Sequence, residues 1–283
     1  MGNGKLKVAT CQFAVSSSVK RNSSAIQGYM AKARKAGADI IHFPECALSG
    51  YVGTDFANFS HFDWETLRSE TEKIMALAKK LTLWVILGST HRLTEPNKPH
   101  NSLYLIGGDG QIHDRYDKRF CTKGDLRRLT PGNRFVTFNI KGVRCSLLIC
   151  FDVRFPEIYR ELYKKGVRCI FQSFYNARQK GPSVHTHIMR QSMQCMAATN
   201  NFWASVSNPS GYYSPYPSCF IRPDGVIVKQ LNQNRAGIMI NTVDMSLKLY
   251  DPMDGFRELA INGKFDNGDG EINDPRSKDR TGY

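Results

Sequence analysis

The sequence lacks the features of a membrane, secreted or multidomain protein. None of its 283 residues lie in an apolar run that approaches the ~20 residues of a membrane-spanning helix. Its first residues, Met-Gly-Asn-Gly-Lys-Leu-Lys, contain no apolar core of a secretory signal. No Pro/Gly/Ser-rich linker, low-complexity tract or internal repeat divides the chain. We therefore expect a cytoplasmic protein with no membrane partner, folded as a single domain over residues 1–283, a length sufficient to bury a core.

Cysteine pairs of the kind that bind metals are also missing. The chain has 8 Cys but no Cys-x-x-Cys pair and no Cys/His cluster at zinc spacing. His185-x-His187 is the nearest approach to a metal pair, and no third ligand accompanies it. Most cysteines lie in apolar runs, which favours a reducing compartment over a disulfide framework; examples are Cys11, Cys145, Cys169 and Cys219. The sequence thus predicts no metal site.

Acidic residues are scarce relative to basic ones. The chain has 25 Asp and Glu against 39 Lys and Arg, for a formal net charge of +14. The basic residues are spread along the chain, and the densest clusters, 123–128 and 276–280, lack the interleaved aromatics that stack on bases. We therefore expect no nucleic-acid partner, although a scattered positive surface would raise the local concentration of anionic substrates.

Strand-like runs alternate with amphipathic helical ones, and the second half of the chain is rich in strands. Strands are predicted at residues 7–13, 39–43, 83–89, 102–106, 134–138, 143–150, 168–173, 202–206, 218–222 and 226–231. Helices are predicted at 19–36, 64–81, 156–165 and 185–200. This pattern indicates an α/β protein with two sheets and helices outside them.

Cys150 is the most informative residue of the chain. It ends the apolar run Cys-Ser-Leu-Leu-Ile-Cys (145–150) and is followed at once by Phe-Asp-Val-Arg-Phe-Pro-Glu (151–157). A buried strand that stops at a thiol and turns into a Pro-started helix directs the sulfur out of the sheet, as in a nucleophile elbow, where backbone N–H groups of the turn can bind an oxyanion. Cys150 is thus a candidate nucleophile. The alternative is a buried structural thiol, since free cysteine is among the most buried residue types.

Two further segments carry candidate catalytic groups. Residues 39–51, Asp-Ile-Ile-His-Phe-Pro-Glu-Cys-Ala-Leu-Ser-Gly-Tyr, form an apolar run that closes on Glu45 and a glycine-containing turn. Residues 111–120, Gln-Ile-His-Asp-Arg-Tyr-Asp-Lys-Arg-Phe, place Lys118 in a short stretch bounded by glycine-containing turns. Taken singly, the acid is most often a strand-end residue paired at the surface, and the lysine is most often solvated.

In the order Glu, Lys, Cys, these motifs resemble the nitrilase superfamily of carbon–nitrogen hydrolases. The resemblance runs along nearly the whole chain, from 7–13 through the three motifs to 198–208 and 218–227. It implies a four-layer α-β-β-α sandwich that assembles as a homodimer or higher homo-oligomer by packing helical faces together. It also implies that no metal or organic cofactor is required.

An amide needs a nucleophile, a proton donor for nitrogen and an oxyanion site. The resemblance assigns the attack to Cys150, proton transfer to Glu45, and oxyanion stabilisation to Lys118 together with the backbone N–H of Phe151. We expect the Lys–Glu pair to lower the pKa of the thiol on its cationic side.

Two residues have open roles. Many members of the superfamily carry a second glutamate shortly before a Pro-Gly; here Asp125 occupies that place, either supporting the lysine and the substrate or acting as a turn residue beside Gly124. Arg154 either pairs with Glu157 at the helix start, which we favour slightly, or holds a substrate carboxylate in a bidentate fork. Tyr175 and Asn176 end the next strand at the same sheet edge, where they would line the pocket.

The sequence therefore predicts a thiol amidase that acts on a small, non-peptide carboxamide or N-carbamoyl compound and releases ammonia. The residues after the nucleophile resemble the branch that acts on amides of dicarboxylates. The alternatives are a nitrilase that converts a nitrile to a carboxylic acid, and a catalytically weak relative that serves as a binding or regulatory subunit.

Overall fold

The structure is a computed structural model that describes residues 4–178, 180–270 and 272–282. The chain divides into two compact units, with the boundary between Tyr250 and Asp251. All strands of the described residues lie in the first unit. The second unit contains two short helices, α5 (Arg257–Ile261) and α6 (Pro275–Lys278). A single domain over 1–283 remains a prediction.

Two sheets, each six-stranded in the described residues, form the centre of the first unit. The first sheet has the order β12-β1-β2-β3-β4-β5, formed by Gly237–Asp244, Lys5–Gln12, Ile40–His42, Trp84–His91, His100–Ile106 and Ile112–Asp117. The second has the order β11-β10-β9-β8-β7-β6, formed by Ile227–Gln230, Cys219–Ile221, Trp203–Ser207, Cys169–Ser173, Val143–Ile149 and Thr137–Ile140. Parallel pairs occupy the middle of each sheet: β1, β2 and β3 in the first, and β7, β8 and β9 in the second.

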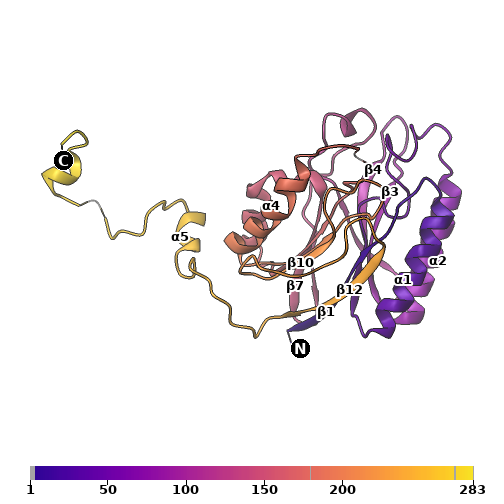
Figure 1. The fold of residues 1–283 in the computed structure, drawn as a ribbon, viewed down its shortest axis with the longest axis horizontal. Coiled ribbons are helices and arrows are strands. Elements are labelled where there is room, and N and C mark those ends of the chain that lie inside the picture. The colour runs from indigo at the N-terminus through magenta and orange to yellow at the C-terminus, as the bar shows by residue number, and fades with distance from the viewer. Residues whose placement is uncertain (1–3, 179, 271, 283) are drawn as a thin grey trace. The chain divides into compact units, whose positions relative to one another are not determined.

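Helices cover the outer faces of the two sheets. Helices α1 (Val19–Lys35) and α2 (Trp64–Leu81) lie on the first sheet, on the opposite side of the unit from α4 (His185–Asn200), which packs with α3 (Pro156–Lys164) on the second (Figure 1). Side chains alternate between the layers as the strand pleat requires: in β3, Ile86 faces the other sheet while Val85 and Leu87 pack in the helix-covered layer. The expected four-layer α-β-β-α sandwich is confirmed.

The helices begin where the sequence supplies caps. The side chain of Ser18 accepts a hydrogen bond from the backbone N–H of Arg21 at the start of α1, and Asp63 does the same for Thr66 at the start of α2. Helix α3 begins with Pro156; a backbone N–H at this first helical position would have no partner within the helix, so proline is tolerated there.

Among the described residues, no helix combines the length and apolar character needed to cross a bilayer.

Two edge strands, β5 and β12, were not predicted from the sequence. Strand β5 reads Ile-His-Asp-Arg-Tyr-Asp, and only Tyr116 is buried in the core, because an edge strand tolerates charged side chains. Strand β12 pairs antiparallel with β1 over its whole length. Strand β6 also starts at Thr137, three residues later than the predicted 134–138.

The parallel strands position the functional segments. Strand β2 runs parallel to β1 and β3 and leads to Glu45, whereas β7 and β8 run parallel to each other and lead to Cys150 and Tyr175. The backbone N–H of Glu45 donates to the carbonyl of Phe174 at 3.2 Å. The strand ends of the two sheets therefore meet directly.

Candidate active site

Cys150 lies at a sharp turn between β7 and the short helix η2 (Cys150–Arg154). Its φ of +40° is in the left-handed region that non-glycine residues avoid, and such strain is concentrated at functional sites. Its side chain is half-buried and lines a cavity of about 360 Å³. The geometry is that of a nucleophile elbow, and Cys150 is not the fully buried structural thiol of the alternative interpretation.

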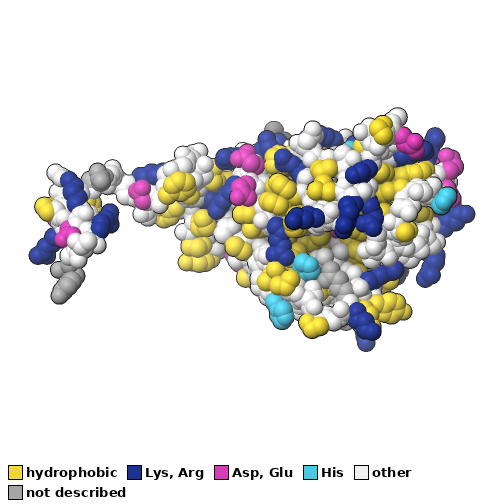
Figure 2. All heavy atoms as spheres, turned by 90° about the horizontal axis from the view of Figure 1, so that it is seen from above, with side chains coloured by type: hydrophobic (Ala, Val, Ile, Leu, Met, Phe, Trp, Pro, Cys, Tyr) yellow, Lys and Arg dark blue, Asp and Glu magenta, His cyan; other side chains and the backbone are white. Residues whose placement is uncertain are grey.

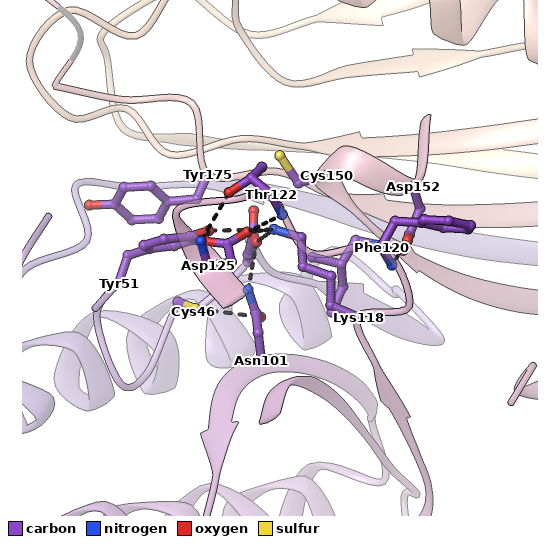
Figure 3. A network of polar contacts seen from close by, with 12 residues as sticks. Cys46, Tyr51, Asn101, Lys118, Phe120, Thr122, Asp125, Cys150, Asp152 and Tyr175 are labelled. Carbon is purple, nitrogen blue, oxygen red and sulfur yellow. Dashed lines mark hydrogen bonds and ion pairs between the residues drawn. The ribbon is translucent and has the colours of Figure 1, made fainter. Parts of the chain in front are cut away.

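Asp152 holds the turn after the nucleophile in place. Its fully buried carboxylate accepts hydrogen bonds from the backbone N–H of Ile149 at 2.9 Å and of Phe120 at 3.0 Å. It also accepts one from the hydroxyl of Tyr116 at 2.8 Å. The elbow of the second sheet is thereby tied to the strand of the first sheet that carries Lys118 (Figure 3).

Glu45 is fully buried and follows β2. Its Oε1 accepts hydrogen bonds from Asn101 Nδ2 at 2.7 Å and Lys118 Nζ at 3.0 Å. Its Oε2 has no hydrogen-bond partner among the described residues. The Glu45 loop crosses β3 so closely that a Cβ on Gly88 would lie 2.0 Å from the carbonyl oxygen of Pro44. The structure thus leaves one oxygen of a fixed, buried carboxylate available for proton transfer.

Lys118 follows β5, and its side chain is only 1% exposed. Besides Glu45, its Nζ contacts Asp125 Oδ2 at 3.0 Å and the hydroxyl of Tyr51 at 3.4 Å. Lys118 and Asp125 point toward each other in Figure 3. The lysine is therefore a buried cation between two carboxylates and not the solvated residue of the alternative interpretation.

Asp125 begins the short helix η1 (Asp125–Arg127). Its Oδ1 accepts the hydroxyl of Tyr51 at 2.7 Å, and its Oδ2 accepts the backbone N–H of Thr122 at 3.1 Å in addition to Lys118. This carboxylate makes local turn contacts, but it is also directed at the lysine. It occupies the position expected of a residue that supports Lys118.

Burial and charge set the protonation of the site. Burial raises the pKa of Cys150, and the negative charge of Glu45 raises it further, while Lys118 and a backbone hydrogen bond from Tyr175 act against this. The expectation that the Lys–Glu pair lowers the pKa of the thiol is therefore wrong for the free enzyme, because desolvation and the nearby acid outweigh the lysine. The thiol is held as S–H and needs a base.

The pKa values of the charged groups around the thiol are shifted in different directions. Burial raises the pKa of Glu45 although Lys118 opposes it. Burial also acts to lower the pKa of Lys118, but Glu45 and the other neighbouring acids outweigh it and hold that pKa well above its usual range. Burial acts to raise the pKa of Asp125, but Lys118 and the hydrogen bond from Tyr51 outweigh it, so that pKa is lowered. The lysine stays charged, and of its two carboxylate partners Glu45 has the raised pKa and Asp125 the lowered one.

The cavity brings together all the sequence-predicted residues except Glu45, whose carboxylate is buried beneath Lys118. Its lining includes Lys118, Asp125, Cys150, Phe151, Arg154, Tyr175 and Asn176. Arg154 is exposed, and its Nη2 lies 3.5 Å from His185 Nδ1. No ion pair between Arg154 and Glu157 occurs among the described residues, which overturns the slightly favoured structural pairing.

Tyr175 and Asn176 direct their side-chain polar groups toward protein. The hydroxyl of Tyr175 donates to Asp55 Oδ2 at 2.7 Å. The Oδ1 of Asn176 accepts the hydroxyl of Tyr216 at 2.5 Å, and its backbone N–H donates to Asn208 Oδ1 at 2.8 Å. Both residues line the cavity, as predicted, and the polar groups named here form hydrogen bonds to other protein groups.

The sequence interpretation gave no role to four residues that lie in or next to this polar network. Tyr51 and Asp152 lie inside the quoted motifs, so the signal was present although no role was assigned to either residue. Asn101 and Asp55 carry no signal of this kind, because Asn101 contacts Glu45 and Asp55 contacts Tyr175, which lie on segments distant in the sequence. Within the part of the chain that the structure describes, no three His, Cys, Asp or Glu residues form a group that could hold a metal ion.

Comparison with known proteins identifies the family of the chain. The carbon-nitrogen hydrolase family model matches residues 7–248, and the chain belongs to that family. Together with the fold and the relatives below, this places it in the amidase-like branch of the nitrilase superfamily, as a hydrolase that acts on carbon–nitrogen bonds.

The relatives include several amidases. Omega-amidase NIT2 of Homo sapiens is 24% identical over 255 residues, which cover 84% of this chain and 88% of that protein. The 2-oxoglutaramate amidase of Bacillus subtilis (strain 168) is 32% identical over 138 residues, covering 48% of this chain and 52% of that protein. An amidase structure from Nesterenkonia sp. superposes with a TM-score of 0.74 at 20% identity, covering 93% of this chain and 97% of that one. The last similarity shows the shared fold.

Proposed function

We propose that the chain is a cofactor-independent thiol amidase that hydrolyses a small, non-peptide carboxamide or N-carbamoyl compound through Glu45, Lys118 and Cys150. The observation that carries this proposal is the buried Glu45 carboxylate. One oxygen is fixed by Lys118 and Asn101, and the other is without a partner among the described residues. Glu45 is close enough to raise the pKa of the Cys150 thiol. This is the arrangement of a general base beside a protonated nucleophile.

In the first half of the reaction, Glu45 takes the thiol proton and the sulfur of Cys150 forms a bond to the amide carbon. Lys118, assisted by the backbone N–H of Phe151, stabilises the resulting oxyanion. Glu45 returns the proton to the amide nitrogen, the carbon–nitrogen bond breaks, and ammonia leaves. A thioester between the acyl group and Cys150 remains.

In the second half, Glu45 accepts a proton from water, whose oxygen attacks the thioester carbon. The carbon–sulfur bond breaks, the thiol is restored by the proton held on Glu45, and a carboxylic acid is released. Each turnover thus consumes one amide and one water and yields one acid and one ammonia. Asp125 keeps Lys118 charged and oriented through both halves.

Among such substrates, we propose a monoamide of a dicarboxylic acid. Arg154 lines the cavity and lies in the short helix that begins at the nucleophile, so a substrate carboxylate has a guanidinium within the same cavity as the thiol. The omega-amidase and 2-oxoglutaramate amidase among the relatives support this choice.

The test is ammonia release from a panel of monoamides of dicarboxylic acids, ureido acids, neutral aliphatic amides and nitriles. We expect the monoamides to have the highest kcat/KM. Arg154→Ala should raise KM for the acidic amides by roughly one to two orders of magnitude, the scale of a lost charge-assisted contact, and leave neutral amides nearly unchanged.

Arg21→Ala, an exposed arginine of α1, is the matched control and should change neither class. Equal losses on acidic and neutral amides, with a lower melting temperature, would show that Arg154 holds the turn and not the substrate. A preference for nitriles over every amide would overturn the amidase assignment.

A further inference from the structure

Asp55 is a buried acid that the chemistry above does not use. It lies in the loop that follows Glu45, and its side chain is 0% exposed. Two hydrogen bonds reach its Oδ2, from the backbone N–H of Tyr51 at 2.8 Å and from the hydroxyl of Tyr175 at 2.7 Å, and Nη2 of Arg178 forms an ion pair with its Oδ1 at 2.8 Å. Oδ1 has no hydrogen-bond partner among the described residues, so the two hydrogen bonds and the ion pair together must compensate the desolvation of the carboxylate.

These partners belong to both sheets. Tyr51 follows the strand of the first sheet that leads to Glu45, whereas Tyr175 and Arg178 follow β8 of the second. The rings of Tyr51 and Tyr175 also pack against each other, with centroids 4.8 Å apart. Asp55 therefore joins the loop after the base to the loop beside the nucleophile, across the cavity that both loops line.

Each of the two tyrosines leads on to a reacting group. The hydroxyl of Tyr51 donates to Asp125, which holds Lys118. The backbone of Tyr175 makes the hydrogen bond that favours the thiolate of Cys150. Asp55 thus orients one residue that supports the oxyanion cation and another that supports the nucleophile.

The backbone around Asp55 is shaped to keep it there. Gly50 has a φ of +74°, and a Cβ at this position would lie 2.7 Å from the carbonyl oxygen of Ser16 and 3.3 Å from Asp55 Cβ. On the other side, Arg178 has a φ of +59° and lines the mouth of the cavity with its side chain 40% exposed. Glycine adopts such a φ without steric cost, whereas at Arg178 it is unfavourable, so the surrounding contacts must hold Arg178 in place.

We propose that Asp55 is a positioning residue for the hydrolysis, acting through Tyr51 and Tyr175 on Lys118 and Cys150. The inference rests on the proposed function, because it assumes that Cys150 and Lys118 are the reacting groups. Asp55 itself touches neither the substrate nor the thiol. Its contribution is to hold the two loops so that the sulfur of Cys150 and the ammonium of Lys118 are both within reach of the substrate amide.

The experiment compares Asp55→Asn, Tyr175→Phe and the double variant with the parent protein. Two quantities are measured: kcat for ammonia release from a neutral amide, and the rate at which iodoacetamide alkylates Cys150, located by mass spectrometry. Asp55→Asn should lower both about tenfold, because a charge-assisted hydrogen bond is lost on each loop, while KM changes less than kcat. Tyr175→Phe should lower both, and the double variant should be no slower than Asp55→Asn alone, since the two groups act as one unit.

Asp39→Asn is the matched control, because Asp39 also accepts a backbone N–H, from Lys7 at 2.9 Å, and pairs with Lys141 far from the cavity. It should lower the melting temperature without changing kcat or alkylation. Unchanged kcat and alkylation in Asp55→Asn, or multiplied losses in the double variant, would overturn the role of Asp55. If Asp55→Asn does not fold, Tyr175→Phe alone decides the matter by the same two measurements. Failure of the parent to release ammonia from any amide would instead contradict the proposed function, and the alkylation rates would still test the positioning.

Discussion

At the scale of single residues, the thiol of Cys150 and the carboxylate of Glu45 depend on each other. Burial and the acid hold the thiol protonated, and the same acid has a free oxygen to take that proton. Burial raises the pKa of Glu45, and Lys118, which donates to the other oxygen of that carboxylate, acts to lower it. In the proposed mechanism, proton transfer and oxyanion stabilisation are thus divided between neighbouring groups of opposite charge.

The charge and compact shape of Lys118 are testable by substitution. Lys118→Ala should lower kcat about a hundredfold or more, the effect of removing an oxyanion donor, and it leaves Glu45 and Asp125 as uncompensated buried acids. Lys118→Arg should not restore activity, because a planar guanidinium does not fit the site of a compact ammonium. Steady-state ammonia release measures both.

Lys123→Ala, an exposed lysine in the same segment, should behave as the parent protein. Full activity in Lys118→Arg would remove the lysine from the mechanism.

The residues that the sequence could predict are those that lie in recognisable motifs. Glu45, Lys118 and Cys150 each lie in a short motif whose order is informative. Asn101 and Asp55 act on partners that lie 56 and 120 positions away in the sequence, and only the folded sheets bring these together. The pKa of the thiol was predicted in the wrong direction because a sequence gives the signs of the neighbouring charges but not the extent of burial.

At the scale of elements, the site depends on strands that end at the same edge. Central, apolar strands were predicted well, since burial on both faces leaves near-continuous apolar runs. The edge strand β5 was missed because its side chains are mostly polar, although it carries Lys118 at its end. The function of that lysine was therefore predicted from its motif and not from its strand.

The two sheets are joined by a buried polar contact as well as by apolar packing. In β2, His42 lies between Ser205 of β9, 2.9 Å from its Nδ1, and Ser173 of β8, 2.8 Å from its Nε2. Burial lowers the pKa of His42 to about 3. The imidazole is therefore neutral in the folded protein at neutral pH. In the unfolded chain it binds a proton as the pH falls through about 6.5.

This gives the stability of the fold a defined pH dependence. Because the folded pKa is the lower one, the contribution of His42 is complete above about pH 6.5 and is lost as the pH falls toward the folded value. From pH 7.5 to pH 5 the free energy of unfolding should fall by about 2 kcal/mol on account of this residue. Urea unfolding of the parent and of His42→Gln at the two pH values measures it as the difference between their pH dependences.

His61→Gln is the control, because His61 is exposed and should leave the dependence unchanged. An identical pH dependence in the parent and in His42→Gln would show that His42 does not titrate in this way.

At the scale of the whole molecule, charge and assembly bear on function in different ways. The chain carries a formal net charge of +14, and on the face drawn in Figure 2 the Lys and Arg side chains are spread among other residue types. This is consistent with attraction of anionic substrates. Assembly through helical faces and a cytoplasmic location remain predictions. The carbon-nitrogen hydrolase match ends at residue 248, close to the boundary between the two compact units.

The most direct test of the account is the rate of ammonia release by Cys150→Ala, measured on the amide that the parent protein hydrolyses fastest. Cys145→Ala, in which a buried thiol of β7 is removed, is the control. We predict that Cys150→Ala folds with a melting temperature near that of the parent and releases no ammonia above background, whereas Cys145→Ala loses stability through lost packing and keeps its turnover. Near-normal ammonia release by a folded Cys150→Ala variant would contradict the assignment of Cys150 as the nucleophile.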